Sequence, residues 1–393
     1  MTNSKHVPKR RFKEFELDDE WEQLKLGDHA NILTGGTPNT SISSYWEPKE
    51  IPWMSSGEVN RKRLDKTDNM ISNDGIRNSS ARWVKKHSIL IALAGQGKTR
   101  GMVAVNNIPL TTNQSVAAIE PDKTLNYEFV FQNLSKRYDE LRLISSGDGS
   151  RGGLNKQIVS DISIACPNVN EQELIGNFLA DFDSLITMNQ HKLDKLKNLK
   201  KAYLAELFPA EGERVPKRRF PGFEGEWEEK KLGEMSNITA GGDVDKDKLL
   251  TKGNYPVLAN AHTNEGIIGY YEENYQIEAP AVTVTGRGDI GFAKARKENF
   301  TPVVRLLSIK SKHNVDFLAE AINQNKVIFE STGVPQLTIP KLSNYKIYFP
   351  SEVDEENSIG NFLVSLDSLI TLQQHKLDKL NDLKKAYLNE LFV

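Results

Sequence analysis

Cysteine and long hydrophobic runs are nearly absent from this chain. Cys166 is the only cysteine among 393 residues, so an internal disulfide or a zinc site built on cysteine pairs cannot form. The longest apolar run, Ile89–Ala94, is far shorter than the roughly 20 residues that span a bilayer. The polar, basic start MTNSKHVPKRRF does not resemble a signal peptide. These absences predict a cytoplasmic protein that does not enter a membrane.

Known catalytic motifs are missing as well. The seven histidines show no metal-ligand spacing, and the sequence has no nucleophile elbow and no HExxH motif. It also lacks the N-P-P-[YF] or D-P-P-[YF] signature of enzymes that methylate base amino groups, and any helicase or nuclease motif. The segment ALAGQGKT (92–99) resembles a phosphate-binding loop, but Ala92 replaces its first glycine and an expected strand follows it. We therefore expect no catalytic residue, no metal site and no cofactor.

One segment occurs twice and tells most about the organisation of the chain. Residues 175–208 and 359–392 lie 184 positions apart and are identical at 26 of 34 aligned positions. Apolar residues recur in both at steps of three and four, the period of an amphipathic helix. Asn170 with Glu173 is expected to cap the first helix, and Pro209 to end it. The apolar stripe of such a helix needs a partner, and the second copy is the nearest candidate.

The rest of the chain is duplicated more loosely. PKRRF occurs at 8–12 and 216–220, and the pattern W-E-x-x-K-L-G follows at 21–27 and 227–233. Because the segments between these motifs and the repeated helices have diverged, we call them variable domains. The predicted boundaries are 1–170 for the first variable domain, 171–208 for the first helix, 209–226 for a linker, 227–354 for the second variable domain and 355–393 for the second helix.

The variable domains are expected to mix helices and strands, because short β-rich runs alternate with Gly, Asn and Pro turns. The first helix must carry the chain from one variable domain to the other, and the second must carry it back. The predicted fold class is therefore α+β, with two pseudo-twofold-related variable domains joined by two long antiparallel, coiled-coil-like helices. In the alternative, each helix packs only on its own variable domain.

Positive charge gathers in the variable domains, although the whole chain has a formal net charge of −2. Residues 61–100 carry ten Lys and Arg against three Asp, and residues 281–312 carry seven against two acids. Two basic segments at matched places favour a nucleic-acid partner. Each contains a glycine-rich hairpin, and 89–105 aligns with 279–295. Glycine lets the backbone approach DNA closely, although a plain hairpin without a DNA contact remains the alternative.

Twelve polar or basic side chains of the variable domains are expected to contact DNA. Arg and Gln, which read guanine and adenine edges, are prominent among them. The first hairpin and its turn supply four of the twelve, and His262 lies in an expected exposed loop. The full set is Thr37, Arg77, Arg82, Gln96, Lys98, Thr99, Arg100, Arg151, His262, Arg287, Lys294 and Gln336.

In the order of these parts the chain resembles the specificity subunit of type I restriction–modification systems. The resemblance rests on the W-E-x-x-K-L-G starts, the two helices with IGNFL and KKAYL, and short motifs that occur at 34–38 (TGGTP), 255–257 (YPV), 95–97 and 286–288 (Gly-x-Gly). It covers nearly the whole chain. It implies two target recognition domains, each reading one half of a bipartite, asymmetric site in double-stranded DNA. The variable domains share little beyond this frame, so no base specificity is carried over.

The resemblance also implies partners. The helices would dock two modification subunits, which bind S-adenosylmethionine and methylate adenine, and restriction subunits that use ATP to translocate and cut DNA. The chain itself would be a non-catalytic, DNA-binding subunit of the restriction system. Two other functions stay open from the residues alone: an architectural or regulatory DNA-binding protein without enzymatic partners, and a structural adaptor whose variable domains bind protein.

Overall fold

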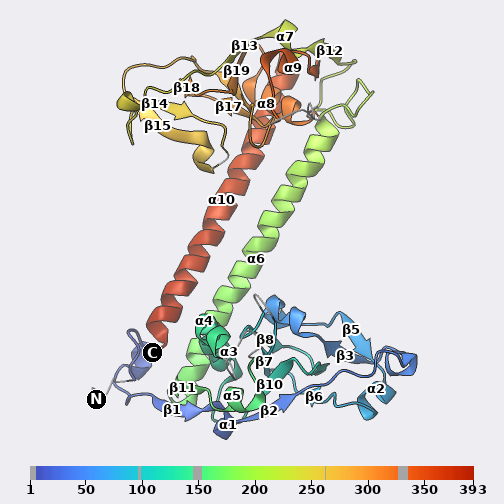
Figure 1. Ribbon diagram of the computed structural model, residues 1–393, viewed down its shortest axis with the longest axis vertical. Coiled ribbons are helices and arrows are strands. Elements are labelled where there is room, and N and C mark those ends of the chain that lie inside the picture. Colours follow the sequence, from blue (N-terminus) through green and yellow to red (C-terminus); the bar gives the residue numbers. More distant parts are fainter. Residues whose placement is uncertain (1–5, 96–98, 145–152, 262, 326–334) are drawn as a thin grey trace. The chain divides into compact units, whose positions relative to one another are not determined.

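The chain folds into two compact units that share both long helices. The first unit comprises Met1–Asn189 and Lys376–Val393, and the second comprises Gln190–His375. Each contains one variable domain and part of both α6 (Val169–Leu207) and α10 (Val353–Leu391) (Figure 1). The computed structural model describes residues 6–95, 99–144, 153–261, 263–325 and 335–393.

A mainly antiparallel sheet forms the centre of each variable domain. Its strand order is β2-β10-β7-β8-β4 in the first unit and β13-β19-β16-β17 in the second. The first set is β2 (Ala30–Thr34), β4 (Arg63–Leu64), β7 (Ile89–Ala92), β8 (Val103–Asn106) and β10 (Val116–Pro121). The second set is β13 (Ser236–Ala240), β16 (Ala281–Thr285), β17 (Ala293–Arg296) and β19 (Leu306–Ser311). The sheets match strand for strand except at β4, which pairs in parallel with β8 and has no counterpart among the described residues.

Smaller sheets repeat the same plan, with orders β1-β11 and β5-β3-β9-β6 in the first unit and β12-β20 and β15-β14-β18 in the second. The first unit's strands are β1 (Glu22–Lys25), β3 (Ile51–Met54), β5 (Asn69–Ile71), β6 (Trp83–Val84), β9 (Leu110–Thr112) and β11 (Ser163–Cys166). The second unit's strands are β12 (Glu228–Lys231), β14 (Tyr255–Leu258), β15 (Ile267–Tyr271), β18 (Thr301–Pro302) and β20 (Lys346–Phe349). The α+β class with two long helices is confirmed.

Short helices cover these sheets and connect them to the long helices. In the first unit they are α1 (Leu26–His29), α2 (Asn73–Arg77), α3 (Tyr127–Lys136), α4 (Tyr138–Leu143) and α5 (Lys156–Ser160). In the second they are α7 (Leu232–Met235), α8 (Val315–Asn323) and α9 (Ile339–Ser343). The helix pairs α1/α7, α3/α8 and α5/α9 occupy matching places in the two units.

The Leu-Gly pair that follows each Trp-Glu start is required by close helix packing. A Cβ atom on Gly27 would lie 2.8 Å from the Cβ of Ser160, and one on Gly233 would lie 2.7 Å from the Cβ of Ser343. Any larger residue would therefore push α1 away from α5, or α7 away from α9. The repeated W-E-x-x-K-L-G motif thus encodes a local packing contact that both units need.

The glycine of each IGNFL segment lets a long helix touch the start of a domain helix. The side chains of Asn126 and Asn314 cap α3 and α8, and each accepts two backbone N–H bonds. A Cβ atom on Gly176 would lie 2.9 Å from the backbone nitrogen of Phe129, and one on Gly360 would lie 2.5 Å from Oδ1 of Asn314. Both copies keep glycine because the cap occupies the space beside it.

Within each unit the long helices run antiparallel and pack through aromatic rings. In the first unit, Tyr387 of α10 packs on Phe178 and Phe182 of α6, with ring centroids 5.0 and 5.5 Å apart. In the second, Tyr203 of α6 packs on Phe362 of α10 at 4.7 Å. The ends of the helices also enter the cores of the variable domains. The antiparallel pair is therefore confirmed, and the alternative in which each helix packs only on its own variable domain is not, because each helix packs on its partner as well as on the variable domains.

The first long helix begins earlier than its sequence suggests. Oδ1 of Asn168 accepts a hydrogen bond of 3.0 Å from the backbone N–H of Glu171, so Asn168 is the N-cap. The expectation that Asn170 and Glu173 cap this helix is wrong. Asn168 is the first cap-forming residue after strand β11 and Pro167, so the helix starts there and Asn170 lies inside it.

The PKRRF segments anchor the starts of the variable domains to the long helices. Arg11 forms a two-bond ion pair with Glu171 of α6, and Arg219 forms the same pair with Glu355 of α10. Arg10 lies 2.7 Å from the carboxylate of Glu390, so the N-terminal segment runs beside the C-terminal end of α10 within the first unit (Figure 1). The start and end of the chain therefore meet there, as Phe208 and PKRRF meet in the second unit.

This arrangement predicts that the chain tolerates circular permutation. Nine residues (209–217) separate Phe208 from Arg218, and ten (393 and 1–9) would separate Phe392 from Arg10 after direct fusion of the ends. A permutant that begins at Glu213 and ends at Gly212 should fold and melt within a few degrees of the parent, measured by circular dichroism. A permutant opened inside β7 serves as the control and should not fold. An insoluble Glu213 permutant would contradict the prediction.

Candidate nucleic-acid interface

The two glycine-rich hairpins are present, but their turns differ from the sequence alignment. The carbonyl of Leu93 accepts from the N–H of Leu154, and the carbonyl of Gly286 accepts from the N–H of Leu337. Gly286 therefore matches Leu93 rather than Gly95. The turn after β7 has nine residues (93–101) before its pairing with β8 resumes, and the turn after β16 has six (286–291). The gap-free alignment of 89–105 with 279–295 could not show this difference, because it assumes turns of equal length.

The structure places eight of the twelve expected DNA-binding residues. Thr37, Arg77, Arg82 and Arg287 are exposed, whereas Thr99, Arg100, Lys294 and Gln336 are partly buried. Arg77 ends α2, Arg287 lies in the turn after β16, and Arg100 lies in the turn before β8. The other four, Gln96, Lys98, Arg151 and His262, lie outside the described residues.

The TGGTP loop gathers Thr37 and Arg82 on one surface of the first unit. Gly36 approaches the chain before Arg82 so closely that a Cβ atom would lie 2.7 Å from the backbone nitrogen of Ala81. The hydroxyl of Thr37 donates a hydrogen bond of 2.6 Å to Oε1 of Gln114, which is also exposed. An amide can donate and accept at a base edge, so Gln114 joins this surface. Sequence reasoning missed it because nothing local marks the turn before β10.

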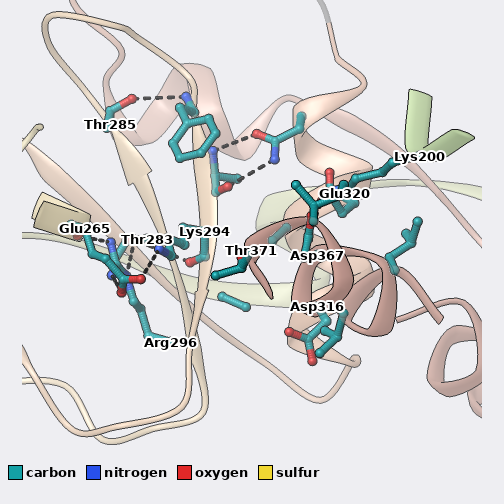
Figure 2. A pocket seen from close by; sticks show the side chains of 18 of the residues that line it. Lys200, Glu265, Thr283, Thr285, Lys294, Arg296, Asp316, Glu320, Asp367 and Thr371 are labelled. Atoms are coloured by element: carbon teal, nitrogen blue, oxygen red, sulfur yellow. Dashed lines mark hydrogen bonds and ion pairs between the residues drawn. The ribbon is translucent and has the colours of Figure 1, made fainter. Parts of the chain in front are cut away.

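Many basic residues counted in the sequence are paired inside their own unit. Arg61 lies 2.5 Å from Asp68, Lys297 lies 3.0 Å from Asp316, and Lys294 lies 3.1 Å from Glu265. Figure 2 shows Lys294 with Glu265 in a pocket, and Arg296 bonds to the same glutamate segment. The local charge count of 281–312 therefore overstates the positive surface, because Asp316 and Glu265, which pair with its lysines, lie outside that segment.

Arg63 binds two carboxylates at once. Its guanidinium forms two hydrogen bonds with Glu128 of α3, at 2.5 and 3.0 Å, and a third of 3.1 Å with Asp183 of α6. Lys384 of α10 reaches the other oxygen of Asp183 at 2.5 Å. Burial alone would lower the pKa of Arg63, but the bonds and charges of Glu128 and Asp183 raise it. Four elements of the first unit thus meet in one charged network.

The same network holds the Asp183 carboxylate in its ionised form. Burial alone would raise the pKa of Asp183, but the charge and hydrogen bond of Lys384, the hydrogen bond of Gln132 and the charge of Arg63 lower it. In the second unit the matching aspartate, Asp367, lies on α10 and the matching lysine, Lys200, lies on α6. Lys200 lies 2.8 Å from both Asp367 and Glu320 of α8 (Figure 2).

The described part of the chain shows no group of three or more His, Cys, Asp and Glu residues that could hold a metal ion. Burial raises the pKa of the Cys166 thiol to about 12, so this cysteine is an inert core residue. None of the described helices has the length and apolar character needed to cross a membrane.

Known proteins resemble this chain over most of its length. Residues 18–198 and 224–382 match the protein family described as type I restriction modification DNA specificity domain. A type I restriction enzyme specificity subunit of Escherichia coli is 28% identical over 176 residues, which are 44% of this chain and 43% of that protein. The MjaVIII specificity subunit of Methanocaldococcus jannaschii is 22% identical over 414 residues, with 96% of this chain and 93% of that protein covered.

Solved structures show the same fold. The crystal structure of a type I restriction–modification S subunit from M. genitalium has a TM-score of 0.70 at 15% identity and covers 98% of this chain and 99% of that one. A structure from a study of complex assembly and conformational transition in a type I system has a TM-score of 0.50 at 15% identity, with 95% and 97% covered.

The charged network predicts an unequal response to matched substitutions. Asp183→Asn should lower the free energy of unfolding at pH 7 by roughly 3 kcal/mol, because it leaves Lys384 without its buried counter-charge and removes one of the two carboxylates that bind Arg63. The folded pKa of Asp183 lies below its ordinary 3.8, so its stabilisation is present above that pH and is lost as pH falls through the folded pKa. The deficit should therefore shrink at pH 3 in urea unfolding.

The control is Asp367→Asn at the matched repeat position. The side chain of Asp367 is 51% exposed, compared with 13% for Asp183, so its loss should cost less than about 1 kcal/mol. Equal destabilisation by both variants would show that the burial of Asp183 does not increase its contribution to the free energy of unfolding.

Proposed function

Because this chain belongs to the family of type I restriction modification DNA specificity domains, we propose that it is the subunit through which a type I restriction–modification complex reads DNA. The observation that carries the proposal is the match of this family to both halves of a chain whose two units share one internal plan. In this role the chain selects the site and supplies no catalytic group, and the chemistry belongs to partner subunits.

Each variable domain reads one half of a bipartite site, and the two halves have different sequences. The two domains share the frame of sheets and the contacts with the long helices, yet their surfaces differ. The hairpin turns have nine and six residues, and strand β4 belongs to the first sheet alone among the described residues. Different loops on one frame present different side chains to base edges, which is what an asymmetric site requires.

Exposure supports some of the residues proposed for DNA contact more than others. Thr37, Arg82 and Gln114 share one surface of the first unit, where a bend of the loop brings them together. Lys294 would reach a phosphate only by leaving Glu265. The remaining proposed contacts are Arg77, Thr99 and Arg100 in the first unit, Arg287 and Gln336 in the second, and, from the sequence alone, Gln96, Lys98, Arg151 and His262.

The long helices supply surfaces for two modification subunits. Besides their first residues, Val169 and Val353, the long helices expose three large apolar side chains in each unit at matched repeat positions, with 39% to 68% of each residue accessible. A repeated set of exposed apolar residues favours a protein partner over an accident of surface composition. One adenine methyltransferase subunit per unit fits this duplication, and restriction subunits would join through them. The sets are Leu185, Met188 and Leu383 in the first unit and Leu369, Leu372 and Leu199 in the second.

Methylation mapping tests the proposed function and the reading residues together. A strain that lacks this gene but keeps the partner subunits should lose adenine methylation at one bipartite motif, and the wild-type gene should restore it. Arg287→Ala should weaken DNA binding by about 1–3 kcal/mol if Arg287 reads a base, and relax only one half of the motif. Arg214→Ala, in the exposed linker, is the matched control. An unchanged methylation pattern in the deletion strain would refute the function.

Subunit stoichiometry tests the docking surfaces. Leu372→Glu should reduce the number of bound modification subunits from two to one, and the double variant with Met188→Glu should bind none, because a carboxylate cannot be buried cheaply in an apolar contact. Native mass spectrometry of the purified complex measures this directly. Asn381→Glu adds the same charge to an exposed position of α10 and should leave two subunits bound. Full occupancy in the double variant would place docking elsewhere.

A further inference from the structure

A pocket in the second unit lies where the first unit holds an arginine side chain. It has a volume of about 560 Å³ and is enclosed by β16, β17, α8 and the neighbouring parts of α6 and α10 (Figure 2). Its charged lining comprises four acids and three cations, a formal charge of −1. They are Glu265, Asp316, Glu320, Asp367, Lys200, Lys294 and Arg296.

Two acids of this pocket, Asp316 and Asp367, match the two acids that bind Arg63. Asp316 and Glu128 each lie two residues after the asparagine that caps their helix, and Glu320 and Gln132 lie one turn further on. Asp367 and Asp183 are the same position of the repeated helix. In the first unit Glu128 and Asp183 together bind the guanidinium with three hydrogen bonds.

The described residues of the second unit include neither the strand nor the ring that fills this space in the first. Arg63 belongs to β4, and its guanidinium carbon lies 5.3 Å from the centre of the Phe131 ring. The residue that matches Phe131 is Ala319, which lines the pocket. No described strand takes the place of β4 in the second unit. The pocket therefore occupies the place that Arg63 of β4 and the Phe131 ring fill in the first unit.

The edge of β17 is also prepared for a strand. In the first unit the N–H groups of Val105 and Asn107 donate to the carbonyls of Lys62 and Leu64, at 2.8 and 2.9 Å. Successive N–H groups of a strand point alternately to its two neighbours. Ala295 and Lys297 match Val105 and Asn107, so their N–H groups point away from β16 toward the open edge of the second sheet. The amide of Asn323 engages both backbone groups of Ala293, so the unoccupied stretch begins just beyond it.

We propose that the second unit receives an extended segment of a partner protein that carries an arginine. The segment pairs in parallel with β17, and its guanidinium enters the pocket among Asp316, Glu320 and Asp367. One guanidinium neutralises the formal charge of the lining, and its planar fork suits two carboxylates. Lys297 now pairs with Asp316, but its side chain is 60% exposed and can swing aside. DNA does not fit, because four acids repel phosphate. This proposal goes beyond DNA reading and does not depend on it.

The chain itself provides a probe. A fluorescein-labelled peptide with the sequence of residues 59–66, VNRKRLDK, contains the strand that fills this place in the first unit. Titration of the full-length protein should give saturable anisotropy, and hydrogen exchange should show new protection in 293–297. Replacing the arginine that corresponds to Arg63 with lysine keeps the peptide charge but removes the fork, and should weaken binding at least about tenfold.

Variants of the protein complete the test. Asp316→Asn with Glu320→Gln should also weaken binding at least about tenfold, because the charge-assisted bonds are lost. Asp247→Asn with Glu273→Gln removes the same charge from exposed positions of the same unit and should leave affinity unchanged. Equal binding of the lysine peptide, or protection outside 293–297, would overturn the proposal. If the pocket variant fails to fold, the affinities of the wild-type protein for the arginine and lysine peptides still test the proposal.

Discussion

The ion pair between a repeated aspartate and a repeated lysine joins the two long helices inside each unit. Asp183 with Lys384, and Asp367 with Lys200, join opposite ends of the two repeat copies, so each unit needs both copies to complete its core. In the first unit the pair is buried and extended by Arg63, and in the second it lies closer to solvent beside a pocket. The two units therefore share this ion pair and differ in its surroundings, which are Arg63 in the first unit and a pocket in the second.

The near identity of the two long helices has a physical cause in these contacts. Each position of the repeat has the same role in both units, because the first part of a copy leaves one unit and the last part of the other copy enters it. Tyr203 and Tyr387 each pack on the opposite helix, and Gly176 and Gly360 each make room for a capping asparagine. A change in one copy therefore has to suit a reciprocal partner, whereas the loops of the variable domains face no such demand and diverge.

Sequence reasoning was accurate where the pattern was local or repeated. The helix period, the PKRRF segments and the paired motifs predicted the α+β class and the antiparallel helices, because they depend on spacing along the chain. It failed where the decisive neighbour was distant. Asn168 rather than Asn170 caps α6, the hairpin turns differ by three residues, and Lys294 faces Glu265. Each of these depends on a hydrogen bond or an ion pair that only the folded chain brings together.

The sequence by itself therefore determined the duplication, the order of domains and helices, and the family, since all of these are written as repeated residues at a constant offset. The tertiary structure alone decided which cations are available to a partner. Arg63 and Arg296 read as basic surface in the sequence, yet folding places acids from other elements against both. It also decided that one unit holds its own arginine strand while the other keeps an acidic pocket and an open strand edge. Charge is a property of residues, but exposed charge depends on which residues the fold makes neighbours.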